Sequence, residues 1–206
     1  MKHIISLLLA AGLMSTAQAA VFQNGSFENG NYSSVNSFDI IGAGSSAITG
    51  WSVVGHSVDW INQFWVPSHG VRSIDLNGSG YGGVQQTFDT IVGRTYNVSF
   101  DLASNTALQS LKTVNVSAGN FNSAYQFNSV GHTVSDMAWA THSFAFVAQS
   151  ANTTLSFISP TNDGNTYWGA ALDNVSVAVA PVPEPETYAL MGMGLLGLLA
   201  SRRRKK

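Results

Sequence analysis

The sequence predicts an all-β protein, an antiparallel β-sandwich or jelly roll, with an N-terminal signal helix and a C-terminal hydrophobic sorting helix. Three observations lead to this prediction. Apolar and polar residues alternate with a period of two along many short segments between residues 20 and 180. Glycine-containing turn signals separate these segments. Apolar runs with helical character occur only at the two ends of the chain.

Residues 1–19 are typical of a secretory signal peptide. Lys2 supplies the positive charge, residues 4–14 form the apolar stretch, and Ala17-Gln18-Ala19 fits the small-residue cleavage rule. The segment is too short for a stable transmembrane helix. The alternative, a buried N-terminal helix, is disfavoured because a polar segment rich in Gly and Asn follows immediately.

The strongest strand pattern covers residues 95–102, where four apolar residues face one side and four polar residues face the other. The same alternation predicts earlier strands at 51–54, 57–61, 72–76 and 84–88, and later strands at 113–117, 141–146, 154–158 and 174–179. Many short strands at this spacing favour a sandwich. We expect the core to include Tyr96, Val98, Phe100, Phe144, Phe146, Leu155 and Phe157.

Composition excludes several classes of protein. The 206 residues contain no Cys, which rules out disulfides and cysteine-based zinc sites. Only 10% of residues are charged, far below the usual share, and the aromatic content of 11% argues against disorder. Residues 20–180 hold three basic and nine acidic residues, a net charge of −6. Because an acidic body repels phosphates, we expect no nucleic-acid partner.

The C-terminal segment has three parts in order: Pro183-Glu184-Pro185, an apolar run at 188–200, and a basic block. The basic block consists of Arg202, Arg203, Arg204, Lys205 and Lys206. This order resembles the PEP-CTERM sorting signal. The resemblance implies a Gram-negative-type bacterium, an exosortase as processing partner, transient anchoring in the inner membrane, and transfer to the cell surface or a polysaccharide-rich matrix. The alternative is a tail anchor that is never processed.

The central region also resembles a known family. It opens with Asn24-Gly25-Ser26-Phe27-Glu28, continues through Ser57-Val58-Asp59-Trp60-Ile61, and closes with Ala171-Leu172-Asp173-Asn174-Val175. This order is similar to the choice-of-anchor C family and the DUF642 domain, and more remotely to galactose-binding-like jelly rolls. The expected organisation is a signal peptide at 1–19, a galactose-binding-like β-sandwich at 20–180, and a sorting tail at 181–206.

Known catalytic motifs are either missing from the sequence or stand in the wrong structural context, so we expect no enzymatic activity. The sequence lacks H-E-x-x-H and G-x-S-x-G. Residues 78–83 match G-x-G-x-x-G, but strands flank the match where a dinucleotide site needs a strand and then a helix. A pair such as His56 and Asp59 could serve as a general base, although it is one of many possible combinations.

The resemblance to galactose-binding-like sandwiches implies a structural calcium ion held by Glu28 and Asp173. Calcium takes six to eight oxygen ligands, and the chain is rich in Asn, Asp and Gly. In the alternative, Glu28 caps a loop and Asp173 accepts hydrogen bonds from backbone N–H groups. The alternative is the favoured of the two.

Carbohydrate binding is the expected function, because sugar rings stack on exposed aromatic faces. Aromatic residues in loops are the best candidates, and they are Trp65, Tyr81, Tyr167 and Trp168. The acidic body favours a neutral glycan. The competing hypothesis is a structural surface or matrix spacer without a ligand. A binding module should gather at least two aromatic residues in one exposed concave patch, whereas a spacer should bury them all.

Overall fold

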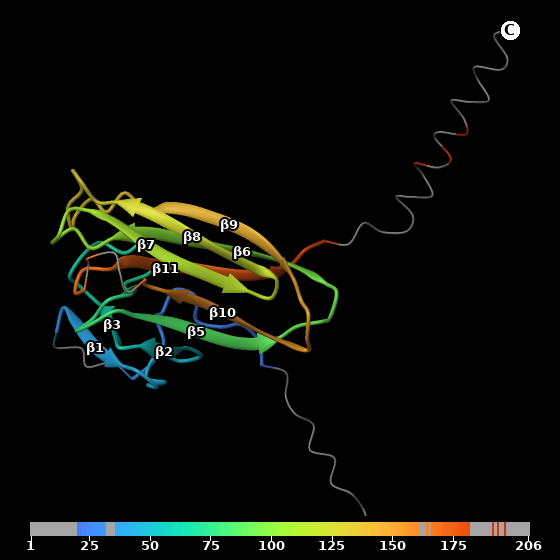
Figure 1. The fold of residues 1–206 in the computed structure, drawn as a ribbon, viewed down its shortest axis with the longest axis horizontal. Helices are drawn as coiled ribbons and strands as arrows, with labels where there is room; N and C mark the ends of the chain where they lie inside the picture. Colours follow the sequence, from blue (N-terminus) through green and yellow to red (C-terminus); the bar gives the residue numbers. More distant parts are fainter. Residues whose placement is uncertain are drawn as a thin grey trace, which may run out of the picture.

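The computed structural model describes residues 20–31, 36–160, 164, 166–181, and the single positions 191, 193 and 196. Two antiparallel sheets face each other in a β-sandwich, as Figure 1 shows. The fold class predicted from the sequence is confirmed. The signal segment and nearly all of the sorting segment lie outside the described residues; Met191, Met193 and Leu196 are helical and exposed.

The described residues form eleven strands. In chain order they are β1 (Phe38–Gly42), β2 (Ser52–Gly55), β3 (Ser57–Ile61), β4 (Ser73–Asp75), β5 (Gly82–Asp89), β6 (Thr95–Ser104), β7 (Leu111–Ala118), β8 (Phe121–Asn128), β9 (Ala140–Val147), β10 (Asn152–Ile158) and β11 (Ala170–Val179). Nine of them correspond to the strands predicted from alternation. The other two, β1 and β8, were not predicted.

The two sheets have six and five strands. The larger sheet has the order β1-β3-β4-β11-β6-β9, and the smaller has the order β2-β5-β10-β7-β8. One row of residues crosses the larger sheet in register: Ile40 pairs with Asp59, Asp59 with Asp75, Asp75 with Ala171, and Ala171 with Ala103. Two carboxyl side chains therefore stand directly opposite each other on β3 and β4.

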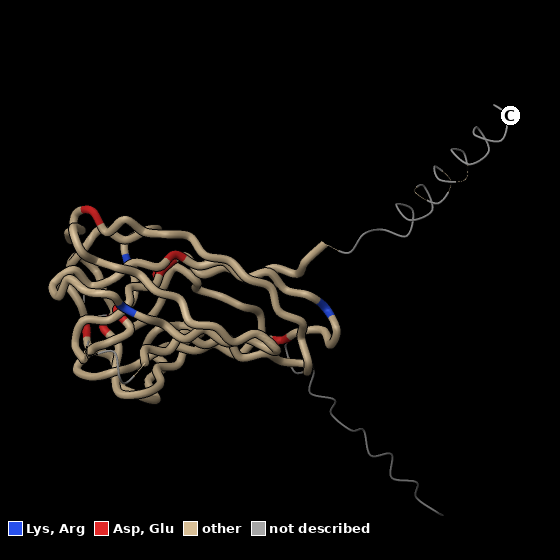
Figure 2. The backbone as a smooth tube through the Cα atoms, turned by 45° about the horizontal axis from the view of Figure 1, so that its top comes forward, with Lys and Arg blue, Asp and Glu red and all other residues tan. Residues whose placement is uncertain are grey.

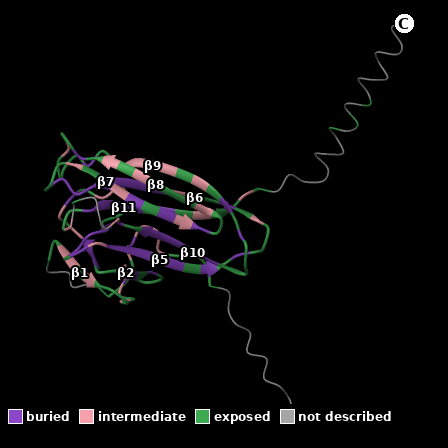
Figure 3. Cartoon of the chain, viewed as in Figure 1, coloured by how far each residue is buried: buried purple, intermediate pink, exposed green. Residues whose placement is uncertain are grey.

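The main core lies between the sheets, where inward-facing residues are almost completely buried (Figure 3). Six of the seven predicted core residues are at most 6% exposed, and Phe144 is half-buried against the same cluster. Phe100 on β6 contacts Tyr125 and Phe157 of the opposite sheet at ring-centroid distances of 5.1 Å each. Such edge-to-face contacts between sheets stabilise the sandwich beyond simple burial of area.

A second, smaller apolar cluster covers the outer face of the larger sheet. It contains Ile61 and Trp65 together with Ala103, Met137 and Ala171. Strand β3 is therefore buried on both of its faces. Asp59 and Asp75 lie on this outer face, at the border of the second cluster, and are removed from bulk water by it.

The two ends of the domain lie at the same end of the sandwich (Figure 1). The carbonyl of Ala20 accepts a hydrogen bond from the Asp89 amide, where β5 ends, and the amide of Ala180 donates to the Thr95 carbonyl, where β6 begins. Most acidic residues gather in the opposite half of the molecule (Figure 2). Within the part of the chain that the structure describes, no helix has the length and apolar character needed to cross a membrane.

Candidate functional site

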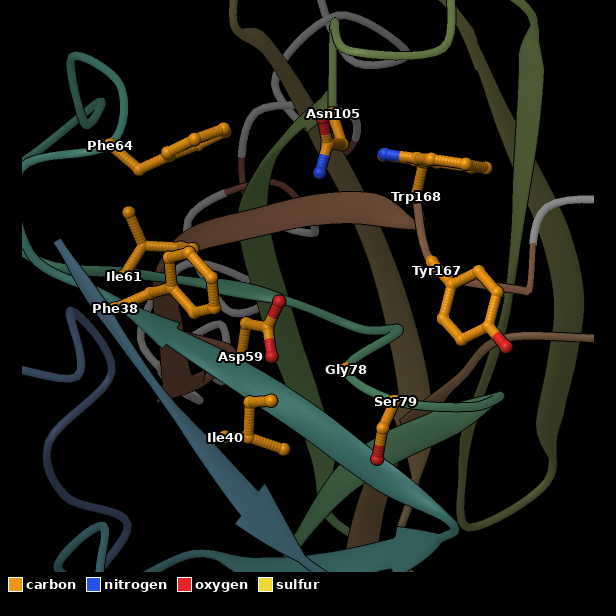
Figure 4. Close-up of a pocket in the computed structure, with 10 residues that line it drawn as sticks. All are labelled: Phe38, Ile40, Asp59, Ile61, Phe64, Gly78, Ser79, Asn105, Tyr167 and Trp168. Atoms are coloured by element: carbon orange, nitrogen blue, oxygen red, sulfur yellow. The ribbon is translucent and has the colours of Figure 1, made fainter.

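A pocket of about 350 Å³ opens at the end of the sandwich that lies away from the chain ends. This volume is within the usual range for small-molecule sites, about 300–1,000 Å³. Figure 4 shows its walls: Phe38 and Phe64 stand on one side, Tyr167 and Trp168 on the other, and Asp59 lies between them. The full lining is Phe38, Ile40, Asp59, Ile61, Phe64, Gly78, Ser79, Asn105, Tyr167 and Trp168.

Strand ends and the loops that follow them build this pocket. Phe38 and Ile40 come from β1, and Asp59 and Ile61 come from β3, where the pairing of Phe38 with Ile61 places them side by side. Asn105 directly follows β6, and Gly169 alone separates residues 167–168 from β11. Loops supported by a rigid sheet are where proteins usually place binding residues.

Asp75 anchors the pocket floor through a complete set of hydrogen bonds. Its Oδ1 accepts from the amides of Asn77 (3.0 Å) and Gly169 (2.8 Å), and its Oδ2 accepts from Nδ2 of Asn105 (2.8 Å). A Cβ at position 169 would lie 2.4 Å from Oδ1, so only glycine allows this approach. Asp75 thereby fixes both the loop carrying Asn105 and the segment carrying Trp168.

Asp59 is bonded quite differently from Asp75. Its side chain is 9% exposed, and its Oδ1 is buried with no hydrogen-bond partner among the described residues. Gly78 lies against it, since a Cβ at position 78 would stand 2.9 Å from Oδ1. Burial raises the pKa of Asp59 to about 8, and the neighbouring Asp75 carboxylate adds to the rise.

Burial also raises the pKa of Asp75 to about 7, although its hydrogen bonds and the Lys112 ammonium act in the opposite direction. Like charges on adjacent strands oppose simultaneous ionisation, so the two carboxyl groups titrate as a coupled pair. Near neutral pH the pair holds a proton. Asp59 thus holds a buried carboxyl oxygen without a hydrogen-bond donor among the described residues, next to a second buried carboxyl group.

These pKa values predict that stability falls as the pH rises. Carboxyl groups with raised pKa values bind more protons in the folded state than in the unfolded state, where the Asp pKa is about 3.9. The contribution of this pair to stability is therefore fully present below about pH 4 and is lost as the pH rises to about 8. Since one unit of pKa difference is worth about 1.4 kcal/mol, we expect the melting temperature to drop by several degrees between pH 5 and pH 8.

Asp59→Asn should raise the melting temperature at pH 8 and leave it nearly unchanged at pH 5, because the amide keeps the shape and removes the charge. Asp136→Asn is the matched control, since Asp136 is exposed in the connection between β8 and β9 and does not line the pocket. Scanning calorimetry at both pH values makes the comparison. A melting temperature that rises between pH 5 and pH 8 would contradict the burial of this pair.

Small polar side chains line one rim of the pocket. The Ser57 hydroxyl lies 3.1 Å from that of Ser79 and accepts a hydrogen bond from the Ser79 amide at 2.8 Å. Nδ1 of His56 lies 3.2 Å from the same Ser57 hydroxyl. The structure thus joins His56 to two serines, and the pairing of His56 with Asp59 considered from the sequence is not among its hydrogen bonds.

Two of the four aromatic residues predicted to bind ligand line the pocket. Tyr167 is 54% exposed and Trp168 is 36% exposed, with their rings in an edge-to-face contact at 5.8 Å. Tyr81 is half-buried beside the pocket; its hydroxyl accepts a hydrogen bond from Thr166 at 3.2 Å, next to Tyr167. The structure places both side chains at the surface of the pocket, and their role in ligand binding stays a prediction.

The prediction for Trp65 as a stacking platform is wrong. Its side chain is only 4% exposed, and its Nε1 donates a hydrogen bond to the Ser73 hydroxyl at 2.8 Å. The polar loop that suggested exposure folds back onto the outer face of the larger sheet, where Trp65 fills the second cluster. A buried indole with its N–H satisfied offers no face to a sugar.

Sequence reasoning missed Phe38, Phe64, Ser79 and Asn105, and it did not assign Asp59 to a ligand site. One signal was present for Asp59. Acidic residues are rarely buried, yet Asp59 stands inside a short, otherwise uncharged strand pattern, and the pattern around Asp75 has Arg72 as its only other charge. The other four lie on segments whose meeting depends on the tertiary fold.

Glu28 and Asp173, the predicted calcium ligands, both hold the loop between β3 and β4. Oε1 of Glu28 accepts from the amides of Val71 and Arg72 at 2.9 Å each. Oδ2 of Asp173 accepts from the amides of Ser68 and His69 at 2.9 Å each. This is the arrangement of the favoured alternative, in which the two carboxylates accept backbone hydrogen bonds.

A bulge in β11 aims Asp173 at this loop. Pairing with β6 shifts after Asp173, and Asn174 adopts a left-handed backbone with φ of 50°, which Asn tolerates better than most residues. Burial raises the pKa of Asp173 to about 7, with Glu28 adding to the rise against the backbone hydrogen bonds.

Among the described residues, no three His, Asp or Glu side chains are grouped as metal ligands. Both carboxylates accept backbone hydrogen bonds, and calcium binding by Glu28 and Asp173 stays a prediction.

The geometry defines a β-sandwich domain with a pocket lined by aromatic side chains, and comparison with known proteins shows its family. The model described as "Protein of unknown function (DUF642)" matches residues 20–178, so the chain belongs to the DUF642 family. The PEP-CTERM protein-sorting motif matches residues 181–205. Both family resemblances inferred from the sequence are confirmed.

One curated relative is halomucin from Haloquadratum walsbyi (strain DSM 16790 / HBSQ001), which is 31% identical over 183 residues. The match covers 87% of this chain and 2% of halomucin, so the chain spans about 2% of that protein's length. Among solved structures, an arabinose-bound MgGH51 α-L-arabinofuranosidase has a TM-score of 0.52 at 13% identity, covering 80% of this chain and 27% of the enzyme. A family 35 carbohydrate-binding module from Paenibacillus barcinonensis has a TM-score of 0.45 at 17% identity, covering 64% and 94%. The similarity to the arabinofuranosidase shows a shared fold.

Proposed function

We propose that this protein is exported, sorted by an exosortase, and displayed at the cell surface or in the extracellular matrix, where its sandwich binds a non-anionic glycan without catalysis. The observation that carries the binding proposal is the exposed pair Tyr167 and Trp168 at the mouth of a pocket with polar groups at its floor. Sugar recognition needs this combination of an apolar ring face and convergent hydrogen-bonding groups.

The chemistry of the pocket supports a sugar ring as ligand. The indole of Trp168 provides a flat apolar face, while Asp59, Asn105 and Ser79 provide hydrogen-bonding atoms for hydroxyl groups. The negative charge of the surrounding body repels anionic polymers. The spacer hypothesis expects no such clustered, exposed aromatic patch, and it becomes the explanation only if no glycan binds.

Trp168→Ala should weaken glycan binding by about 1–3 kcal/mol, the effect measured for bases that stack on aromatic side chains. Trp168→Phe should keep most of the affinity, because it keeps a stacking face. Ile91→Ala is a suitable control, since Ile91 is 60% exposed at the opposite end of the sandwich. A polysaccharide array with and without calcium finds the ligand, and titration calorimetry measures the variants. Equal binding by Trp168→Ala and the parent protein would remove this pocket as the site.

Export and sorting make a separate prediction. Mass spectrometry of the protein outside the producing cell should show the loss of residues 1–19 and of the apolar tail that follows Pro183-Glu184-Pro185. Changing Pro183 and Pro185 to Ala should leave the unprocessed form in the membrane fraction. An external protein with an intact tail would contradict exosortase processing while leaving glycan binding untouched.

A further inference from the structure

The unpartnered carboxyl group of Asp59 limits which ligand the pocket suits best. Its Oδ1 is buried without a donor among the described residues, and the side chain as a whole is nine-tenths buried while still lining the pocket. Leaving a buried acceptor without a partner costs about 1–3 kcal/mol, and more for a charged group. A ligand that brings a donor to Asp59 recovers this free energy on binding.

The neighbouring Asp75 makes a positive donor better than a neutral one. The two carboxyl groups face each other across β3 and β4, and the donors to Asp75 are the uncharged amide groups of Asn77, Asn105 and Gly169. Lys112, a cation whose charge acts on Asp75, donates hydrogen bonds from its ammonium to the Leu108 carbonyl and the Ser110 hydroxyl. A sugar hydroxyl would give Asp59 one hydrogen bond, whereas an ammonium group gives up to three and offsets the repulsion.

The pocket walls also suit a cation. Four aromatic side chains, Phe38, Phe64, Tyr167 and Trp168, stand around the carboxyl group (Figure 4). Aromatic faces attract ammonium groups, and the attraction grows when the cation is removed from water. The acidic residues that gather in this half of the molecule add a long-range attraction for positive ligands (Figure 2).

We propose that the pocket recognises an amino-sugar unit with a free amino group, its ammonium bound by Asp59 and its ring stacked on Trp168. This inference rests on the proposed glycan-binding function and names the class of glycan. An ammonium group at this position favours the ionised form of the Asp59–Asp75 pair, so we expect binding to release a proton. N-acetylation of the amino group abolishes its charge and should abolish the preference.

The test compares two glycans of equal length, a chitosan tetrasaccharide and its fully N-acetylated counterpart, on the full chain by titration calorimetry at pH 6.5 and low salt. We expect at least tenfold tighter binding of the free amine. Asp59→Asn should bring the two affinities within about twofold of each other, while Asp136→Asn, which removes the same charge elsewhere, should keep the preference. Trp168→Ala should weaken both ligands.

Each remaining outcome decides between this inference and the proposed function. Equal binding of both oligosaccharides, with both sensitive to Trp168→Ala, overturns the amino-sugar inference and leaves glycan binding standing. Binding of neither, at millimolar concentration, together with a negative polysaccharide array, overturns both. If cadaverine binds as tightly as the chitosan oligosaccharide, or if calcium displaces it through Asp59, the site is a simple amine or metal site and the inference falls.

Discussion

Replacing Phe100 with alanine should lower the free energy of unfolding by about 3–5 kcal/mol, the usual cost of removing a buried phenylalanine. Phe100 is completely buried on β6 and its ring meets Tyr125 of β8, His142 of β9 and Phe157 of β10. One side chain therefore joins both sheets. The cavity left behind cannot close without moving strands of each sheet.

Urea denaturation of the purified protein measures this loss. Asn97→Ala is the matched control, because Asn97 lies on the same strand but is exposed on the opposite face, and it should change stability by no more than about 0.5 kcal/mol. A loss of less than about 1 kcal/mol for Phe100→Ala would mean that the assigned face of β6 is wrong. The slope of the denaturation curve should stay the same in both variants.

Replacing Trp65 with alanine should have a comparable effect on stability, about 3–5 kcal/mol. The side chain is nearly buried, its ring packs edge-to-face on Phe64 at 5.6 Å, and its N–H binds the Ser73 hydroxyl. Trp65→Phe should cost less, because it keeps much of the packing and gives up mainly the hydrogen bond. Thermal and urea melting give the values.

The two tryptophans thus separate stability from binding. Trp168→Ala should weaken the glycan complex and leave the melting temperature within a few degrees of the parent, since its side chain is 36% exposed. Trp65→Ala should instead lower the melting temperature strongly, because the Trp65 side chain is only 4% exposed. If Trp65→Ala melted like the parent protein and lost glycan affinity instead, Trp65 would be a surface platform after all.

The alternation of apolar and polar residues along single segments predicted most of the strands of this fold. Strand β6 was predicted almost in full, because its side chains point alternately to the core and to solvent, and the sequence is apolar and polar at the matching positions. Strand β8 was missed although Gly119 and Asn120 mark a turn and Phe121, Tyr125 and Phe127 follow on one face. It lies at the edge of its sheet, so its pattern of exposure is weak. Strand β1 is likewise an edge strand with mixed burial.

The site was only half predictable, and the reason is physical. The sequence of a loop shows aromatic residues among polar ones, and this pattern singled out Tyr167 and Trp168. It does not show onto which surface the loop folds. The same reasoning failed for Trp65, because residues 62–65 turn back onto the sheet. The meeting of Phe38, Asp59 and Asn105 depends on strand order, which brings together residues far apart in the chain.

Placing the chain ends at one end of the sandwich and the pocket at the other has a consequence for how the protein meets its surroundings. Strand β6 runs from the first end to the second over ten residues, a distance of about 30 Å at the usual rise per residue. Under the proposed sorting, in which the C-terminal segment is held in the membrane, we expect the mouth of the pocket to point away from the membrane. We expect one polysaccharide chain to bind the outer ends of many copies of this domain at once. The weak affinities of the single pockets would then combine into a strong overall attachment through multivalency.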